Sequence, residues 1–292
     1  MPKLYVVATP IGNLGDLSLR AQETLRACDL IAAEDTRVTL KLLAHFDIHT
    51  PLISNHRHNE DERAAFLIQK MISEDLSVAL VTDAGTPAIS DPGSFLVAKA
   101  KEENIEVLAI PGPSAMAAAL SVSGMDTREF AFYGFLPRKT GDLKAKLRSI
   151  AETGIPIAVV HESPYRVINL IQIIAETLPE CRISASCDLT KVYEKTIWGT
   201  ANEVLEQLNT NEKANKGEYC IVLDLHDVKI KPKTEESLSS PAVRILSLMM
   251  EGLSLKEASD KLKDEGYRRN DIYRAKENVC RFLTQTKEEE QA

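Results

Sequence analysis

The chain has 292 residues, of which 44% are hydrophobic and 27% charged, and its formal net charge is −8 at pH 7. This composition is typical of a globular protein with two ordinary domains, and no stretch approaches the roughly 20 apolar residues of a membrane span. The acidic balance means that a polyanionic partner must be met by local basic patches. Because Met1–Ala8 lacks a signal-peptide pattern, we expect a cytoplasmic protein without membrane contact.

The cysteines and histidines argue against a disulfide framework and a metal site. The five cysteines are scattered, odd in number and free of CxxC spacing, so we expect buried, reduced thiols. His56 and His58 form an H-x-H pair in a polar loop, but no third ligand accompanies them at a recognisable spacing. We therefore expect no metal and prefer substrate contact or a solvated loop for this segment.

The first predicted strand is Leu4–Ala8, which ends in the loop Thr9–Asp16 before a helix over Ser18–Ala27. This crossing carries no G-x-G-x-x-G, and the chain has no G-x-x-x-x-G-K-[ST], so neither the dinucleotide fingerprint nor the P-loop is present. Taken alone, the loop is more readily a simple turn than a binding loop.

The second predicted strand, Leu30–Ala33, delivers polar residues to the same edge of the sheet. Glu34 and Asp35 are chemically able to transfer a proton or to orient Arg37. Capping of the following helix by Asp35 or Thr36 is the safer interpretation for one of these side chains.

The loop Thr82–Gly93, which follows the predicted strand Val78–Val81, is the feature around which we expect the chain to be organised. Open α/β sheets bind ligands at the carboxyl ends of their strands. Gly85 can adopt a positive φ and bring the main chain close to a ligand, while Pro87 and Pro92 stiffen the loop. A long, well-packed turn fits these residues equally well.

A third loop follows the predicted helix Ser94–Glu103 and the predicted strand Ile105–Ile110. Its residues Pro111–Ser114 precede an alanine-rich helix, so small residues and free N–H groups lie at a helix N-terminus, where a ligand can approach closely. Three loops are thus predicted to meet at one edge of an α/β sheet.

A second domain is predicted to begin at the hinge Gly124–Arg128, with Phe130–Phe135 as its first strand. Residues 138–148 carry five positive side chains against one negative, which indicates either a solvated helix face or contacts to phosphate groups. Further strands are predicted at Pro156–Val160 and Cys220–Leu225.

Three ionisable residues of this second domain could act as acid or base. Glu162 follows the strand Pro156–Val160, and Lys191 and Glu194 lie in a later polar segment. A structural salt bridge between strand ends explains such residues more often than catalysis does, so both interpretations stay open.

The last part of the chain is predicted to be a small helical module after a linker. Ser254 and Glu257 form a capping box, and the segment 266–281 is rich in arginine and lysine, as in helix-turn-helix modules, although a packing or dimerisation hairpin is nearly as compatible. The expected organisation is an N-terminal α/β domain at 1–123, a second α/β domain at 124–228, a linker at 229–241, a helical module at 242–285 and a disordered tail at 286–292.

These motifs together resemble those of one family. The matching segments are ATPIGNLGD at 8–16, AEDTR at 33–37, DAGTP at 83–87, SDPG at 90–93, PGPSA at 111–115, GFLP at 134–137, ESPYR at 162–166 and LTK at 189–191. In this order, over residues 3–225, the chain resembles the ribosomal RNA small subunit methyltransferase I family of the tetrapyrrole methylase superfamily. It departs at Ala88, where Gly is expected, and at Cys187 and Asp188, where Arg and Glu are expected.

The resemblance implies two α/β domains with S-adenosylmethionine in the cleft between them, and a homodimer. It implies 2′-O-methylation of a cytidine in the decoding region of 16S rRNA, and the acidic balance favours rRNA within the small ribosomal subunit as substrate. By similarity, the donor-binding residues are Pro10, Asp83, Ala84, Gly85, Thr86, Ile89, Ser114, Ala115, His161 and Tyr219.

A ribose hydroxyl is a poor nucleophile until its proton is being removed, so a general base is useful. Lys191 would need a lowered pKa for that role and could otherwise steady the developing alkoxide. The candidates for proton transfer are Glu34, Asp35, Glu162, Lys191 and Glu194, and those for RNA contact are Arg37, Arg57, Arg138, Lys139, Arg166, Arg268 and Arg269. A precorrin-type methylase of a small molecule and a non-catalytic RNA-binding module are the alternatives.

Overall fold

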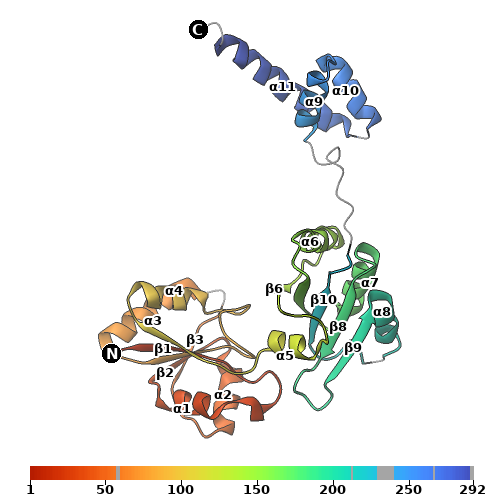
Figure 1. The fold of residues 1–292 in the computed structure, drawn as a ribbon. Helices are drawn as coiled ribbons and strands as arrows, with labels where there is room; N and C mark the ends of the chain where they lie inside the picture. The colour runs from red at the N-terminus through yellow and green to blue at the C-terminus, as the bar shows by residue number, and fades with distance from the viewer. Residues whose placement is uncertain (57–59, 212, 229–239, 266, 290–292) are drawn as a thin grey trace. The chain divides into compact units, whose positions relative to one another are not determined.

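The computed structural model describes residues 1–56, 60–211, 213–228, 240–265 and 267–289. The chain divides into two compact units, Met1–Lys229 and Ile230–Ala292. The first unit contains two five-stranded sheets, and the second contains helices (Figure 1).

The first sheet has the strand order β3-β2-β4-β1-β5, and all its strands are parallel. Parallel strands bring their carboxyl ends to one edge, so the loops after β1, β2, β4 and β5 meet there, as predicted. The strands are β1 Lys3–Val7, β2 Leu30–Ala33, β3 Leu52–Ser54, β4 Val78–Val81 and β5 Glu106–Ile110. The helices are η1 Leu14–Asp16, α1 Leu19–Ala27, α2 Thr36–His45, α3 Glu60–Glu74 and α4 Ser94–Glu102.

The two faces of this sheet are covered by different helices (Figure 1). Leu30 and Leu80 pack with residues of α3 and α4, whereas Ile31 and Val81 pack with residues of α1 and α2. Successive side chains of a strand point to opposite faces, so these continuous apolar runs fill both cores. The helices after the neighbouring strands β1 and β4 lie on opposite faces, so these two strand ends are the topological switch point, where open α/β sheets bind ligands.

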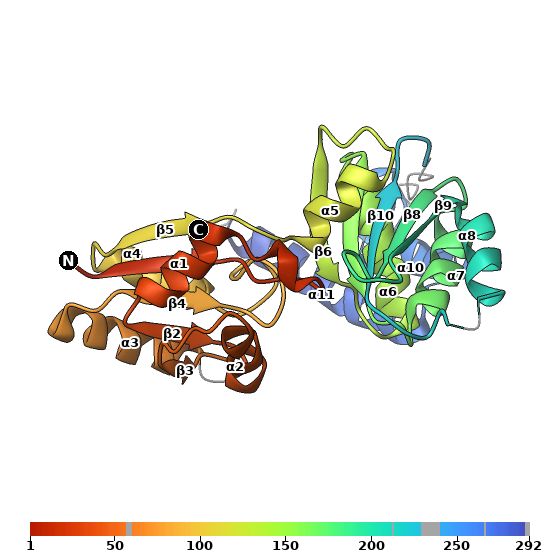
Figure 2. The ribbon, with the colours of Figure 1, turned by 90° about the horizontal axis from the view of Figure 1, so that it is seen from below.

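The second sheet has the order β6-β7-β10-β8-β9, in which only β6 and β7 are parallel. Helix α5 packs on one face, against β7 and β10, and α6, α7 and α8 cover the other (Figure 2). The core of this domain therefore begins with α5, before the expected boundary at 123. The elements are α5 Ala115–Val122, β6 Phe130–Phe135, α6 Thr140–Glu152, β7 Ile157–Glu162, α7 Val167–Thr177, β8 Arg182–Cys187, β9 Lys195–Thr200, α8 Ala201–Asn209 and β10 Tyr219–Asp224.

The second unit is a bundle of three helices, α9 Pro241–Met250, α10 Leu255–Asp264 and α11 Arg269–Glu289, around the buried residues Ile245, Leu262 and Val279. The capping box predicted at the start of α10 is confirmed, since Ser254 and Glu257 satisfy each other's backbone N–H groups. The expected linker lies outside the described residues except for residues 240 and 241, of which Pro241 begins α9. Helix α11 continues to Glu289, so residues 286–289 are helical rather than disordered, and 290–292 lie outside the described residues.

Candidate functional site

The loops after β1, β4 and β5 are joined by hydrogen bonds at the sheet edge. Thr9 and Gly85 form an isolated β-bridge, in which Thr9 N donates to Gly85 O at 2.9 Å and Gly85 N donates to Thr9 O at 3.1 Å. The Thr86 hydroxyl donates to Pro113 O at 3.2 Å. Gly85 has a φ of +90°, a conformation that favours glycine. Its N–H group is used by the bridge and is therefore not available to a ligand.

The register of the second sheet gathers residues from distant parts of the chain at one edge. Phe135 at the end of β6 pairs with His161 at the end of β7, and Tyr219 at the start of β10 pairs with Glu162. On the other side of β10, Tyr219 pairs with Cys187. The aromatic strand, the His-Glu strand end and the final strand therefore present side chains to one place.

A cleft lies where these two sets of loops meet. Its larger part is a pocket of about 430 Å³, and a smaller pocket of about 60 Å³ continues it. Ile11, Ala84, Ala115 and His161 line both parts, so loops of both α/β domains share one continuous wall.

Eight of the ten residues expected to bind a donor line this cleft. They are Ala84, Gly85, Thr86, Ile89, Ser114, Ala115, His161 and Tyr219. The other two, Pro10 and Asp83, line a separate pocket of about 260 Å³ beside η1 and α2. The sequence motifs therefore converge on one cavity, and only Pro10 and Asp83 of the ten residues lie outside its lining.

The wall contributed by His161 is aromatic and uncharged. Its ring lies 5.1 Å from that of Phe132 and 5.8 Å from that of Phe135. Burial lowers the pKa of His161, and this outweighs the opposing effect of Glu218, so the imidazole is neutral at pH 7. Tyr219 contributes little polarity, because it is buried and its hydroxyl donates to Ala214 O at 3.0 Å.

Glu162 also lines the larger pocket, but its carboxylate is held within the protein. It accepts the Ser163 N–H at 2.7 Å and lies 3.1 Å from a guanidinium nitrogen of Arg166. Arg166 donates further to the carbonyls of Leu136 and Pro137, both at 3.3 Å. This pair fixes the loop after β7 against the loop after β6, so Arg166 has a role inside the fold.

Lys191 belongs to an ion-pair cluster at the margin of the cleft. Its ammonium lies 2.8 Å from Asp188 and 2.9 Å from Glu218, which itself lines the larger pocket. Burial opposes the charge, but the hydrogen bonds to both carboxylates outweigh it and raise the pKa of Lys191. The requirement of a lowered pKa for a basic role is not met. Gly12 makes room for this side chain, since a Cβ there would lie 2.5 Å from Lys191 Cγ.

The acidic residues after β2 hold their own loop and tie it to the loop after β4. Asp35 caps α2 and pairs with Arg37, and these bonds lower the pKa of Asp35 to about 2. Glu34 accepts the Thr82 hydroxyl at 2.5 Å. The predicted cap at Asp35 is confirmed, and neither carboxylate is among the residues that line the cleft.

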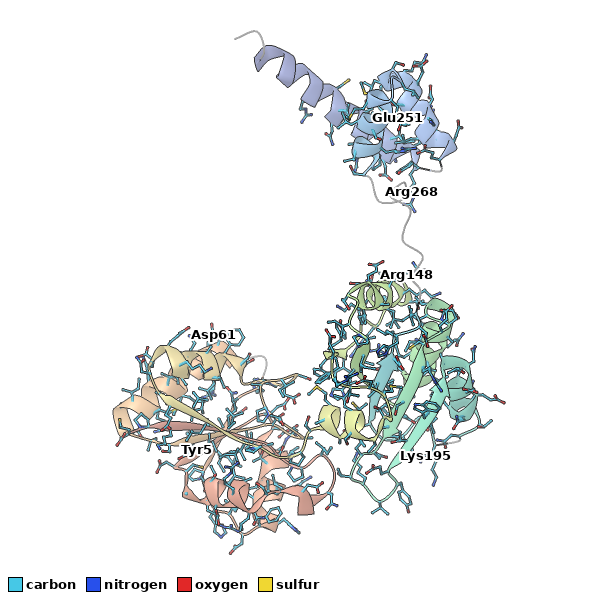
Figure 3. All side chains as sticks on the ribbon, viewed as in Figure 1. Tyr5, Asp61, Arg148, Lys195, Glu251 and Arg268 are labelled. Carbon is cyan, nitrogen blue, oxygen red and sulfur yellow. The ribbon has the colours of Figure 1, made fainter. Side chains whose placement is uncertain are left out.

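The remaining predicted residues are not among those that line the cleft. Glu194 accepts the Thr190 N–H at 2.6 Å and so closes its own loop. Arg138 and Lys139 are exposed just before α6, and Arg268 and Arg269 are exposed at the start of α11, whereas Arg57 lies outside the described residues. Figure 3 labels Arg148, another exposed arginine of the basic stretch, and Arg268.

Sequence reasoning missed Glu218. It lies in the Lys216–Tyr219 segment that opens β10, and only the pairing of Tyr219 with Glu162 brings it beside the cleft. A carboxylate next to a glycine at a strand start was the available signal, but many exposed loops carry such a pair.

Burial keeps most thiols of the chain protonated. It raises the pKa of Cys28 to about 11 and those of Cys181 and Cys220 to about 12, whereas Cys280 is exposed. Within the described ranges, no group of three or more His, Cys, Asp or Glu side chains could hold a metal ion, and His58 lies outside them. None of the described helices is long and apolar enough to cross a bilayer.

Comparison with known proteins gives consistent results for sequence and fold. The family model of tetrapyrrole (corrin/porphyrin) methylases matches residues 3–205. Ribosomal RNA small subunit methyltransferase I from Halalkalibacterium halodurans is 41% identical, over 92% of this chain and 93% of that protein. The protein of the same name from Synechocystis is 43% identical, over 90% and 92%, and that from Escherichia coli O157:H7 is 38% identical, over 93% of each.

Two solved structures share the fold at low sequence identity. Diphthine synthase superposes with a TM-score of 0.60 at 15% identity, over 77% of this chain and 90% of that one. Uroporphyrin III C-methyltransferase from Thermus thermophilus superposes with a TM-score of 0.54 at 17% identity, over 76% and 97%. The family model and these two structures together confirm the predicted fold class, two α/β domains of the tetrapyrrole methylase type.

Proposed function

The chain belongs to the tetrapyrrole methylases and, within them, to the ribosomal RNA small subunit methyltransferase I family, and from this premise we propose that it methylates the 2′-oxygen of a cytidine in 16S rRNA. The methyl donor in this proposal is S-adenosylmethionine, and the acceptor lies in the decoding region. The observation that carries the proposal is the shared cleft, which is lined by loops of both domains and has a lysine–glutamate pair at its margin.

The residues of the cleft fit this donor. S-Adenosylmethionine supplies a methyl group bound to a positively charged sulfur. The larger pocket, about 430 Å³, is within the usual range for small-molecule sites, and Ile11, Ala84 and Met116 provide apolar surface. The rings of Phe132 and neutral His161 attract a cation without the repulsion that a charged imidazole would cause.

The Lys191–Glu218 pair is the part of the cleft suited to the acceptor. An ammonium that stays charged stabilises negative charge as it develops on a ribose oxygen, and a nearby carboxylate can accept the hydroxyl proton. We therefore assign charge stabilisation to Lys191 and proton acceptance to Glu218. Glu162 is less suited to proton transfer, because Arg166 and a backbone N–H hold its carboxylate.

A ribose 2′-hydroxyl distinguishes RNA from DNA, so this chemistry selects RNA. Phe135 lines the larger pocket and lies just before the exposed Arg138 and Lys139, to which we assign contacts with phosphates of a bound strand. Arg268 and Arg269 of the helical unit supply a second basic segment. The net charge of −8 opposes naked RNA, which favours an assembled small subunit as substrate.

The names of the relatives also support a cytoplasmic location, where ribosomal subunits are found. A homodimer is part of the proposal through the family resemblance. Light scattering on the purified full chain tests it, and a monomer mass at working concentration would contradict it.

The proposed activity is tested by transfer of labelled methyl from S-adenosylmethionine to small subunits that lack the modification, followed by nuclease mapping of the label. We expect one 2′-O-methylated cytidine in the decoding region. Donor binding without transfer to subunits, together with transfer to a tetrapyrrole acceptor, would favour a small-molecule methylase. Binding of RNA without any transfer would indicate a non-catalytic module.

A further inference from the structure

A second pocket, of about 360 Å³, lies on the same edge of the second sheet as the cleft. The strand order β7-β10-β8-β9 places the cleft residues on β7 and β10 and the second pocket over β10, β8 and β9. Tyr219 lines both cavities, and Lys195 pairs with Cys187, which pairs with Tyr219. The two pockets therefore lie at the same end of the sheet, the cleft toward the face covered by α5 and the second pocket toward the face covered by α8.

The second pocket is locally basic in an acidic chain. Lys195, Lys213 and Lys216 are exposed and line it, and Figure 3 labels Lys195 at the start of β9. Among the described lining residues the one carboxylate is Asp188, which already pairs with Lys191. The three lysine ammonium groups outnumber the single carboxylate of Asp188, so this pocket attracts an anion although the net charge of the whole chain is −8.

An exposed aromatic ring stands beside these charges. The side chain of Tyr193 is 82% exposed, and the Lys213 ammonium lies 5.6 Å from the centre of its ring. Exposed rings next to cationic side chains are typical of proteins that stack nucleobases and bind the adjoining phosphates.

We propose that this second pocket binds a nucleotide of the RNA substrate that flanks the methylated one, with its base on Tyr193 and its phosphodiester between Lys195, Lys213 and Lys216. Neighbouring strands lie about 4.8 Å apart, so β7 and β9 are separated by about 14 Å, and one RNA strand that passes over the end of the sheet at Tyr219 can bridge this distance. The inference rests on the proposed function, because it assumes that RNA occupies the larger pocket.

The test compares the double variant Lys195→Gln, Lys213→Gln with the control Lys101→Gln, an exposed lysine on α4, in the full chain. Methyl transfer to unmodified small subunits is measured against subunit and salt concentration, and donor affinity is measured by calorimetry. We expect the double variant to raise KM for subunits about tenfold, and to lower the slope of log(kcat/KM) against log salt by about one for each lysine removed, with donor affinity unchanged. A KM and slope equal to those of the control would overturn the inference.

Tyr193 supplies an independent readout. We expect Tyr193→Leu to raise KM for subunits, by the loss of one stacked base, and Tyr193→Phe to restore it. An effect of Tyr193→Leu that Tyr193→Phe does not restore would exclude stacking.

Fluorescence anisotropy with a labelled decoding-region RNA hairpin separates the two proposals. If wild-type protein transfers no methyl to subunits, the proposed function fails, but weaker hairpin binding by the double variant still supports the RNA subsite. If inorganic phosphate weakens hairpin binding by the wild-type protein as much as the double substitution does, the second pocket is a small-anion site, and the proposed RNA subsite is overturned.

Discussion

The Lys191 ammonium lies 2.9 Å from the Glu218 carboxylate, although 27 residues separate them in the sequence. Asp188 holds the same ammonium at 2.8 Å. Two carboxylates around one amine keep it protonated, so Lys191 can stabilise an anion but cannot accept a proton at neutral pH. The division of roles between Lys191 and Glu218 follows from this arrangement.

Replacement of Lys191 tests that division. We expect Lys191→Met to lower kcat by about 10²- to 10³-fold, because one charge-stabilising donor is lost, with little change in donor affinity. Since the pKa of Lys191 is raised above 10.5, its charge, and its contribution to stability, persist below that value and are lost only as pH rises through the folded-state pKa. Titration of Lys191 should therefore not lower the wild-type rate between pH 7 and 10, so Lys191→Arg should leave the shape of the pH profile in this range unchanged. A fall removed by Lys191→Arg would contradict this assignment.

His161 should act as an uncharged aromatic wall. We expect His161→Phe to retain donor affinity and His161→Ala to lose about tenfold, as measured by calorimetry. Burial lowers the pKa of His161 from 6.5, so the folded state binds fewer protons than the unfolded state and this residue's stabilisation is lost as pH falls below 6.5. Urea unfolding from pH 7 to 5 should therefore show a smaller loss of stability for His161→Phe than for wild type. Equal losses would argue against a depressed pKa.

Ala88 has a φ of +64°, a conformation that favours glycine. We expect Ala88→Gly to stabilise the protein by about 1 kcal/mol, because relief of the left-handed alanine exceeds the entropic cost of glycine. Gly93→Ala is the opposing control, since φ there is +133° and a Cβ would lie 2.6 Å from Leu80 Cδ2. Urea unfolding at pH 7 measures both, and a destabilised Ala88→Gly variant would show that the loop tolerates alanine without strain.

The buried Glu162 carboxylate depends on Arg166. We expect Arg166→Met to destabilise the protein by about 3 kcal/mol, because it leaves a buried charge without its partner. The double variant Glu162→Gln, Arg166→Met should recover part of that loss, and the double-mutant cycle isolates the pair from the bonds of Arg166 to Leu136 and Pro137. If the double variant recovers nothing, the backbone bonds of Arg166 rather than the ion pair fix this loop.

The sequence by itself determined the strands whose apolar runs are buried on both faces. The predicted limits of two such strands, Leu30–Ala33 and Val78–Val81, match the structure residue for residue, and so do those of Phe130–Phe135, an edge strand with exposed ends. The loops after the parallel strands meet at one edge as expected. Parallel pairing requires such runs, and Gly, Pro and Asp mark where they end. The strands β3 and β8 carried weaker signals, since β3 has three half-buried residues and β8 mixes buried serines with apolar residues.

Only the tertiary structure decided which of the polar strand ends belong to the cleft. Glu34, Asp35 and Glu194 have the same chemistry as Glu218. Hydrogen bonds hold Asp35 and Glu194 within their own loops and Glu34 against Thr82 of the loop after β4, whereas antiparallel pairing in the second sheet carries Glu218 to Lys191 and His161. A motif specifies which groups a strand end presents. The register between strands that are distant in sequence sets where those groups lie. The charged partners that each group meets there set its protonation state.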